Sequence, residues 1–152
     1  MKCFSSLIVA VALSTPVHAF AQGAHLGYVF GGANAAMESC RCSGGAMQLG
    51  GGGEFMLSKN VGVGGDVSLL VFDRSGYGLL SVNGSYHFAT KGSTHMRPFV
   101  TAGLVANDGA VVAGGGIDRW VKPRVGFRLE VRDQFRPGSA NMLGARFGVV
   151  IR

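Results

Sequence analysis

The chain has 152 residues, of which 47% are hydrophobic and 14% charged, with 26 glycines and a formal net charge of +6. The glycines show no Gly-X-Y period, which excludes collagen, and alternating β-branched and aromatic residues argue against disorder. The basic charge comes without a basic helix or an interleaved aromatic platform, so nucleic acid is not an expected partner.

The first residues have the three zones of a secretory signal peptide: Lys2, an apolar run at 7–13 and the small-residue pattern Ala19-Phe20-Ala21. We expect residues 1–21 to be removed by cleavage after the second alanine, with the first alanine as the alternative site. Residues 22–152 then form one domain. No later segment supplies about 18 consecutive apolar residues, so a membrane role must come from strands.

Eight segments of alternating polarity follow, each near the roughly 9 to 11 residues of a tilted membrane strand. We expect them at residues 24–32, 46–57, 61–72, 78–88, 97–106, 110–120, 124–134 and 141–151. Turn-forming residues such as Ser58-Lys59-Asn60 separate them. The sequence therefore predicts an all-β fold, an eight-stranded antiparallel up-and-down barrel with both ends of the chain on one side. The longest interval, 33–45, is expected to be an external loop.

The second and third segments agree in register and in polarity. Pairing them around Asn60 puts Glu54 opposite Gly64 and Asp66 opposite Gly52, so the polar positions of both strands fall on one face. In a membrane barrel this face lines the lumen, and its many glycines leave room for water.

The fourth segment carries Ser85 and His87 on the inward face, near Asp66 of the third. A lipid A-modifying hydrolase could use such residues. However, positions i and i+2 of a strand lie about 7 Å apart at the backbone, and a triad needs hydrogen-bond contact. These residues also face the lumen rather than lipid, so we interpret them as polar lining and predict no catalytic residues.

The fifth and sixth segments are less regular. Pro98 must lie near a strand start or a bulge. Trp120 is in phase with inward Asp118, although a tryptophan is expected at the lipid interface; a bulge near Lys122-Pro123 could reconcile the two. Arg119 faces outward and can reach lipid headgroups. Aromatic residues gather near both sets of strand ends, as a membrane barrel requires and as the core of a soluble sandwich would also allow. They are Phe55, Phe88 and Trp120 at one end, and Phe72, Tyr77 and Phe135 at the other.

The seventh segment alternates without interruption, with Val125, Phe127 and Leu129 on one face and charges on the other. Together the predicted inward positions form a lumen charge network of four acids and four bases: Glu54, Asp66, Asp118, Arg124, Arg128, Glu130, Arg132 and Arg146. Pairing across Lys122-Pro123 places Asp118 diagonally near Arg124 and Arg128. We expect a salt-bridged plug, with a polar path for small ions as the alternative.

The signal peptide and four stretches resemble the small outer-membrane β-barrel proteins of Gram-negative bacteria, of the OmpA, OmpX and opacity type. The stretches are Gly84-Ser85-Tyr86-His87-Phe88, 97–103, 114–118 and 123–130. The resemblance implies an outer-membrane protein that is inserted by the barrel-assembly machinery. It also implies a monomer that contacts membrane lipids and lipopolysaccharide and carries no cofactor. The family commonly ends in an aromatic residue, whereas this sequence ends in Ile151-Arg152.

We therefore expect no enzymatic activity and a structural or narrow porin-like role. The alternative is a surface adhesin or host-factor binder acting through the loop 33–45. Cys40 and Cys42 lie in that loop; they are free thiols or a strained disulfide, and without a second pair no metal site is predicted.

Overall fold

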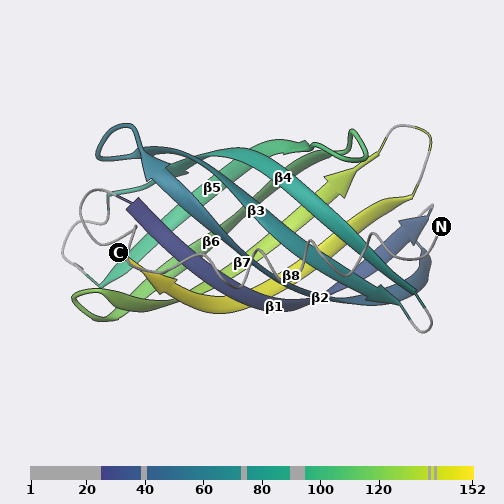
Figure 1. Cartoon of the computed structure of the whole chain (residues 1–152), viewed down its shortest axis with the longest axis horizontal. Coiled ribbons are helices and arrows are strands. Elements are labelled where there is room, and N and C mark those ends of the chain that lie inside the picture. The colour runs from purple at the N-terminus through teal and green to yellow at the C-terminus, as the bar shows by residue number, and fades with distance from the viewer. Residues whose placement is uncertain (1–24, 39–40, 73–74, 90–94, 137, 139) are drawn as a thin grey trace, which may run out of the picture.

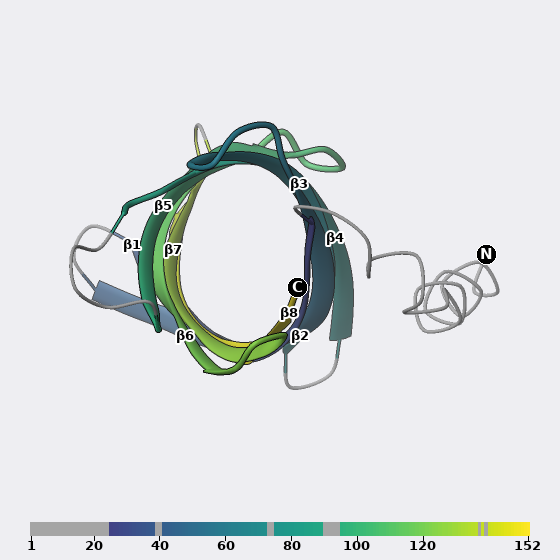
Figure 2. The same cartoon turned by 90° about the vertical axis from the view of Figure 1, so that its left-hand side faces the viewer.

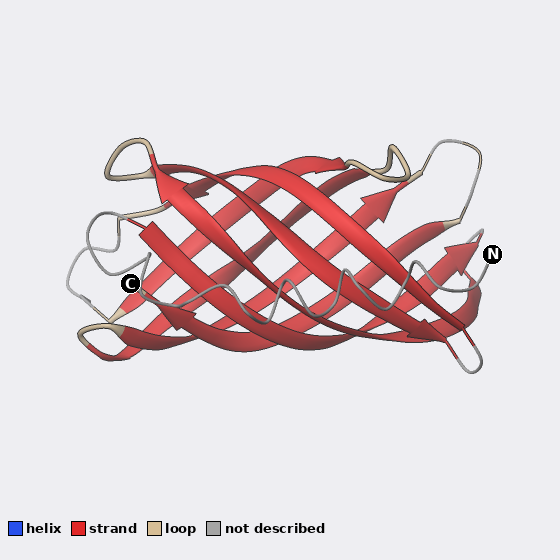
Figure 3. Cartoon of the chain, viewed as in Figure 1, coloured by secondary structure: helices blue, strands red, loops and turns tan. Residues whose placement is uncertain are grey.

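The computed structural model describes residues 25–38, 41–72, 75–89, 95–136, 138 and 140–152. The predicted signal peptide, 1–21, and Cys40 lie outside the described residues. The described chain is a closed barrel of antiparallel strands that pair in chain order (Figure 1), and strands make up nearly all of it (Figure 3). The strands are β1 (His25–Glu38), β2 (Arg41–Met56), β3 (Val61–Phe72), β4 (Ser75–His87), β5 (Met96–Val105), β6 (Val111–Lys122), β7 (Val125–Phe135) and β8 (Asn141–Ile151). The prediction of an eight-stranded up-and-down barrel is confirmed.

The barrel is apolar outside and polar inside. On β7, Phe127 and Leu129 are 44% and 52% exposed on the outer face, whereas Arg128 between them is buried. The same alternation of exposed and buried side chains runs along β3, β4 and β8. An outer apolar surface that encloses a polar interior is the arrangement of a bilayer-spanning barrel and the reverse of a soluble one.

Within the described residues, no helix is long and apolar enough to cross a membrane.

Closure of the ring is visible in the view along the barrel (Figure 2). Gly52 pairs with Asp66 and Glu54 with Gly64, as predicted from the turn at Asn60. Following paired residues around the ring from Leu26 leads back to β1 at Ala36, ten residues further on, the difference between positions 36 and 26. This stagger tilts the strands, and an eight-stranded barrel of this kind is just wide enough to be filled by its own side chains.

Aromatic side chains occupy the space that inward glycines leave. A Cβ atom added to Gly52 would lie 2.8 Å from the Tyr28 hydroxyl, and one added to Gly116 would lie 2.8 Å from the ring of Phe99. The room expected for water at these glycines is therefore filled by rings from neighbouring strands.

The two ends of the barrel differ in what they carry. Here the C-terminal end means the end where β1 begins and β8 finishes, with the turns 57–60 and 123–124; the opposite end holds the connections 106–110 and 136–140. Gly27 pairs with Ile151, so the first and last strands leave the ring at the same end, as an even strand count predicts.

Two sequence expectations about the strand ends are wrong. The interval 33–45 is not a loop, because β1 continues to Glu38 and β2 begins at Arg41, with residues such as Asn34 and Ala46 paired. This stretch is rich in alanine and glycine, so it lacked the polarity contrast that marks a strand. Trp120 lies inside the barrel at 4% exposure, and the irregular register falls between Trp120 and Lys122, too late to turn the ring outward.

Candidate functional site in the barrel interior

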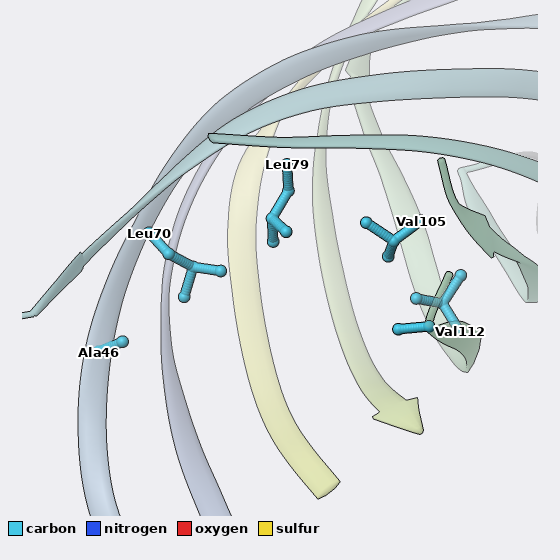
Figure 4. Close-up of a cluster of buried hydrophobic side chains, with 6 residues drawn as sticks. Ala46, Leu70, Leu79, Val105 and Val112 are labelled. Carbon is cyan, nitrogen blue, oxygen red and sulfur yellow. The ribbon is translucent and has the colours of Figure 1, made fainter. Parts of the chain in front are cut away.

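Apolar side chains close the interior at both ends. The cluster at the C-terminal end contains Leu26, Tyr28, Phe30, Trp120 and Val150, with Met56 packed against it. The cluster at the opposite end contains Ala46, Leu70, Leu79, Val105, Ala110 and Val112, with Met142 beside it. Figure 4 shows labelled members of the second cluster pointing into the barrel from several strands. The sequence analysis did not anticipate these layers, because inward positions near strand ends were expected to be polar.

Charged side chains lie beside the first apolar cluster and extend toward the second: Leu26 pairs with Glu54, and the rings of Tyr28 and Phe30 lie against Arg128 and Arg146. On β7 the inward residues Arg128, Glu130 and Arg132 follow Gly126, which pairs with Trp120, and precede Gln134, which pairs with Val112. All three charged side chains are buried. Because isolated charges in a low-dielectric interior are strongly unfavourable, each must find a partner there.

The charge cluster nearer the C-terminal end, here the terminal cluster, consists of Glu54, His87, Asp118 and Arg128. Arg128 donates two hydrogen bonds to Asp118, from Nε to Oδ1 at 2.7 Å and from Nη2 to Oδ2 at 2.9 Å. Its Nη2 also lies 3.5 Å from Glu54 Oε2. His87 Nε2 lies 2.6 Å from Glu54 Oε1, and its Nδ1 lies 4.0 Å from Asp118 Oδ2. The bidentate pair fixes the guanidinium in one orientation.

Two aromatic rings enclose the same guanidinium. The Arg128 Cζ atom lies 4.7 Å from the ring centre of Tyr28 and 4.4 Å from that of Phe99. The ring faces attract the cation and exclude water from it, so the ion pairs of Arg128 act in a dry environment.

The second group, here the central cluster, consists of Asp66, Glu130, Arg132 and Arg146. Arg132 contacts Glu130 at 2.8 Å and Asp66 at 3.0 Å, and Arg146 Nη2 lies 3.6 Å from Asp66 Oδ1. Arg146 Nε also donates to Gln48 Oε1 at 3.3 Å, and Gln48 donates to Ser68 Oγ at 2.7 Å. In the described residues no ion pair joins the two clusters.

The structure brings seven of the eight predicted network residues into these clusters. The prediction that Arg124 faces the lumen is wrong: it lies exposed in the turn between β6 and β7, where its carbonyl accepts a hydrogen bond from the Arg152 amide. β7 begins only at Val125, so the inward phase starts at Gly126. Asp118 is also directly opposite Arg128 rather than diagonal to it.

His87 also belongs to the network. The sequence analysis interpreted this histidine only as polar lining. Ser85 Oγ lies 3.4 Å from His87 Nε2 and donates to the Glu54 carboxylate. Asp66, the predicted third member of a hydrolase-like group, belongs instead to the central cluster. The separation of i and i+2 backbones did not keep the Ser85 and His87 side chains apart, because the two lean toward each other. The shared inward phase of β2 and β4 was the signal that could have placed His87 beside Glu54.

Little free space remains in the interior. A cavity of about 10 Å³, lined by residues including Tyr28, Ser85, Thr101 and Arg132, has room for one water molecule at most. Among the described residues no group of three or more histidine, cysteine or acidic side chains could hold a metal ion. The arrangement can therefore hold charges in fixed positions.

Known structures place this fold in a class. The barrel is similar to Neisserial surface protein A, with a TM-score of 0.65 and 10% identity over 84% of this chain and 96% of that chain. The N-terminal β-barrel domain of Pseudomonas aeruginosa OprF gives 0.60 and 19% over 86% and 100%. Ail, the attachment invasion locus protein of Yersinia pestis, gives 0.57 and 8% over 84% and 95%. No protein-family model matches the chain, and no curated protein matches it.

The fold is thus that of the small eight-stranded transmembrane β-barrels, the class that the sequence resemblance indicated. At these identities the likeness defines the fold alone.

Proposed function

We propose that this protein is a structural β-barrel of the bacterial outer membrane whose lumen is closed to ions and which has no enzymatic activity. The observation that carries the proposal is the filled interior, in which two charge-neutralising clusters pack against aromatic rings and an apolar cluster closes the end opposite the C-terminal end. Removal of residues 1–21, insertion by the barrel-assembly machinery and a monomeric state belong to the same proposal.

Closure has two physical components. An ion that entered from the opposite end would first cross the apolar cluster around Leu70, where nothing replaces its hydration shell. An ion that entered from the C-terminal end would pass the buried Trp120 and the half-buried Arg97. It would then meet arginines already bound to carboxylates, and breaking such a buried pair is strongly unfavourable. Of two interior cavities that the described residues line, one has a volume of about 10 Å³ and the other no room for water, so neither supplies a continuous water path.

The interior also argues against catalysis. Ser85, His87 and Glu54 are in contact, but His87 is 0% exposed and its Nε2 is already bound by the Glu54 carboxylate. A substrate would have to displace the apolar layer at the C-terminal end to reach the serine, which is inconsistent with a hydrolase acting on lipids outside the barrel.

Single-channel recording in planar bilayers tests the closed lumen. We expect the purified protein to show no steady current, and the variant Trp120→Ala with Leu70→Ala, which thins both apolar layers, to show brief openings. The matched control is Leu69→Ala, which changes the neighbouring leucine on the outer face and should remain silent. Large, stable channels in the unaltered protein would overturn the proposal.

Location is tested separately. Cell fractionation should recover the protein with the outer membrane, and its gel mobility should shift on heating as the barrel unfolds. A protein found in the soluble fraction, with no heat-dependent shift, would exclude a membrane barrel.

The adhesin alternative loses its main support because the interval 33–45 is strand rather than loop. The described connections at the opposite end are short, with five residues in each of 106–110 and 136–140. What remains for an external contact is the hairpin formed by β1 and β2, the two longest strands at 14 and 16 residues. A host-binding role would therefore have to use this hairpin.

A further inference from the structure

Six lysines and arginines of the described part of the chain lie at the C-terminal end of the barrel. We call them the basic collar: Lys59, Arg97, Arg119, Lys122, Arg124 and Arg152. They come from the β2–β3 turn, the start of β5, the end of β6, the following turn and the last residue, so they are distributed around the rim. Five of the six are exposed, and Arg97 is half-buried.

The protein itself does not neutralise this charge. Glu54 and Asp118 are the acidic residues nearest this end among those described, and both are buried and bound by Arg128 and His87. In the described part of the chain no collar residue forms an ion pair. Arg97 lies opposite Asp118 and donates to the Lys59 carbonyl. Arg152 donates to the Pro123 carbonyl, and its Cζ atom lies 4.3 Å from the ring centre of the buried Trp120. The other four residues therefore carry the outward positive charge of the collar.

The opposite end lacks such an excess. Asp108 and Asp133 lie there, and the exposed Arg136 is paired with Asp108. Among the residues whose side chains the structure describes, positive charge without an internal partner thus lies at one end of the barrel.

The collar also lies where a bilayer surface would be. Exposed aromatic residues, among them Phe55, Tyr86, Phe88 and Phe127, form the edge of the apolar outer surface at this end. Arg119 pairs directly with Phe127, so the base adjoins the aromatic edge. Aromatic rings favour the membrane–water interface, and basic side chains next to them extend to the lipid phosphates.

We propose that the basic collar binds the phosphate groups of anionic phospholipids in the leaflet at the C-terminal end. This inference rests on the proposed membrane location. A barrel inserted from the periplasm needs to pass only short hairpin connections across the bilayer if both chain ends stay behind, which puts the collar on the periplasmic side. Of the two kinds of anionic lipid expected from the sequence, phospholipid and lipopolysaccharide, the collar then meets the phospholipid. Each basic residue near an anionic surface strengthens association by about fivefold.

Spin-labelled lipids in proteoliposomes test the inference. The bilayer is phosphatidylcholine with a minor fraction of phosphatidylglycerol, and the measured quantity is the association constant of labelled phosphatidylglycerol relative to labelled phosphatidylcholine at the barrel surface. The test variant combines Arg119→Gln, Lys122→Gln and Arg124→Gln, all exposed and outside the interior clusters. The matched control, Arg136→Gln, removes an exposed arginine from a connection at the opposite end.

We expect the unaltered barrel to prefer phosphatidylglycerol several-fold at low salt, and the preference to fall to near one in the triple variant and in 1 M salt, where the Debye length is about 3 Å. Arg136→Gln should leave it unchanged. Absence of a preference in the unaltered barrel, or its loss only in Arg136→Gln, would overturn the inference. A heat-dependent shift in gel mobility verifies that each variant is folded. If the triple variant shows no shift, the lipid preference is measured instead on the double variant Lys122→Gln with Arg124→Gln.

This outcome is independent of the lumen. A conducting barrel that keeps the lipid preference would overturn only the closed-lumen proposal, and a silent barrel without the preference would overturn only the collar.

Discussion

The two charge clusters solve the same problem in different ways. In the terminal cluster one arginine, Arg128, serves two carboxylates, with a bidentate pair to Asp118 and aromatic rings on both sides. In the central cluster two arginines share Asp66, and the amide of Gln48 extends the network. The two clusters therefore differ in redundancy: a single arginine neutralises the carboxylates of the terminal cluster, whereas two arginines do so in the central cluster.

Removal of Arg128 should therefore cause the largest loss. Arg128→Leu leaves the buried Asp118 and Glu54 without their guanidinium, and only His87 and Ser85 still contact Glu54, so we expect the free energy of unfolding to fall by about 3 to 5 kcal/mol. Urea titration read by the folded and unfolded gel bands measures it. A loss within the error of the unaltered protein would mean that water reaches the cluster.

Removing Asp118 together with Arg128 tests whether the two residues are energetically coupled. The double change Arg128→Leu with Asp118→Leu should recover part of the loss, because one stranded charge has been removed. A double-mutant cycle gives the interaction free energy, which should be at least about 1 kcal/mol for residues in direct contact. Simple addition of the two single losses would show that the pair is not energetically coupled.

A substitution at Phe127 tests whether the outer face of β7 contacts lipid. Phe127→Arg introduces a guanidinium one residue from Arg128 but on the outer surface, where no carboxylate can reach it. Because Phe127 lies at the aromatic edge of the apolar surface, we expect a loss of about 1 kcal/mol, the upper value for a basic residue near the membrane interface. Folding into lipid vesicles gives the value, with Phe127→Leu as the control of similar apolarity. Equal stability of both variants would remove the membrane assignment of this face.

The central cluster should tolerate the loss of one arginine. In Arg146→Leu, Asp66 keeps its 3.0 Å contact with Arg132, so the expected cost is about 1.5 to 3 kcal/mol, that of a hydrogen bond to a charged group. The same urea titration applies. A cost equal to that of Arg128→Leu would show that the two arginines of the central cluster do not substitute for each other.

Much of the barrel could be predicted from the sequence because its strands alternate strictly. On β7 the inward Arg128, Glu130 and Arg132 alternate with the outward Phe127, Leu129 and Val131. The turn at Asn60 sets the β2–β3 register without further information. The end of β1 could not be predicted in this way, since alanine and glycine carry no polarity contrast. The start of β7 could not be predicted either. Arg124 continues the alternation of charged residues in the sequence, but it lies in the turn before the strand begins at Val125.

The candidate site was predictable in composition and less so in organisation. Charge balance among inward residues pointed to a filled lumen, yet the division into two clusters depends on the ten-residue stagger, which sets the neighbours across the barrel. That stagger emerges only when all eight registers are known. The inward orientation of Trp120 was not predicted. The usual preference of tryptophan for the membrane interface was given more weight than the strand alternation, which places Trp120 on the same face as Asp118.

Because β1 pairs with β8, the same strands could follow one another along the chain from a different starting strand. Gly27 lies opposite Ile151, and Val29 opposite Val149, so the two end strands are as intimately joined as any consecutive pair. Every other strand pair in the ring is linked by a short connection, and only this one is not. A short linker from Arg152 to His25 would supply the missing connection, and a new opening at the exposed turn 123–124 would preserve every rung of the ladder. The ring thus has no privileged first strand, and a circular permutant that begins with β7 should close into the same barrel.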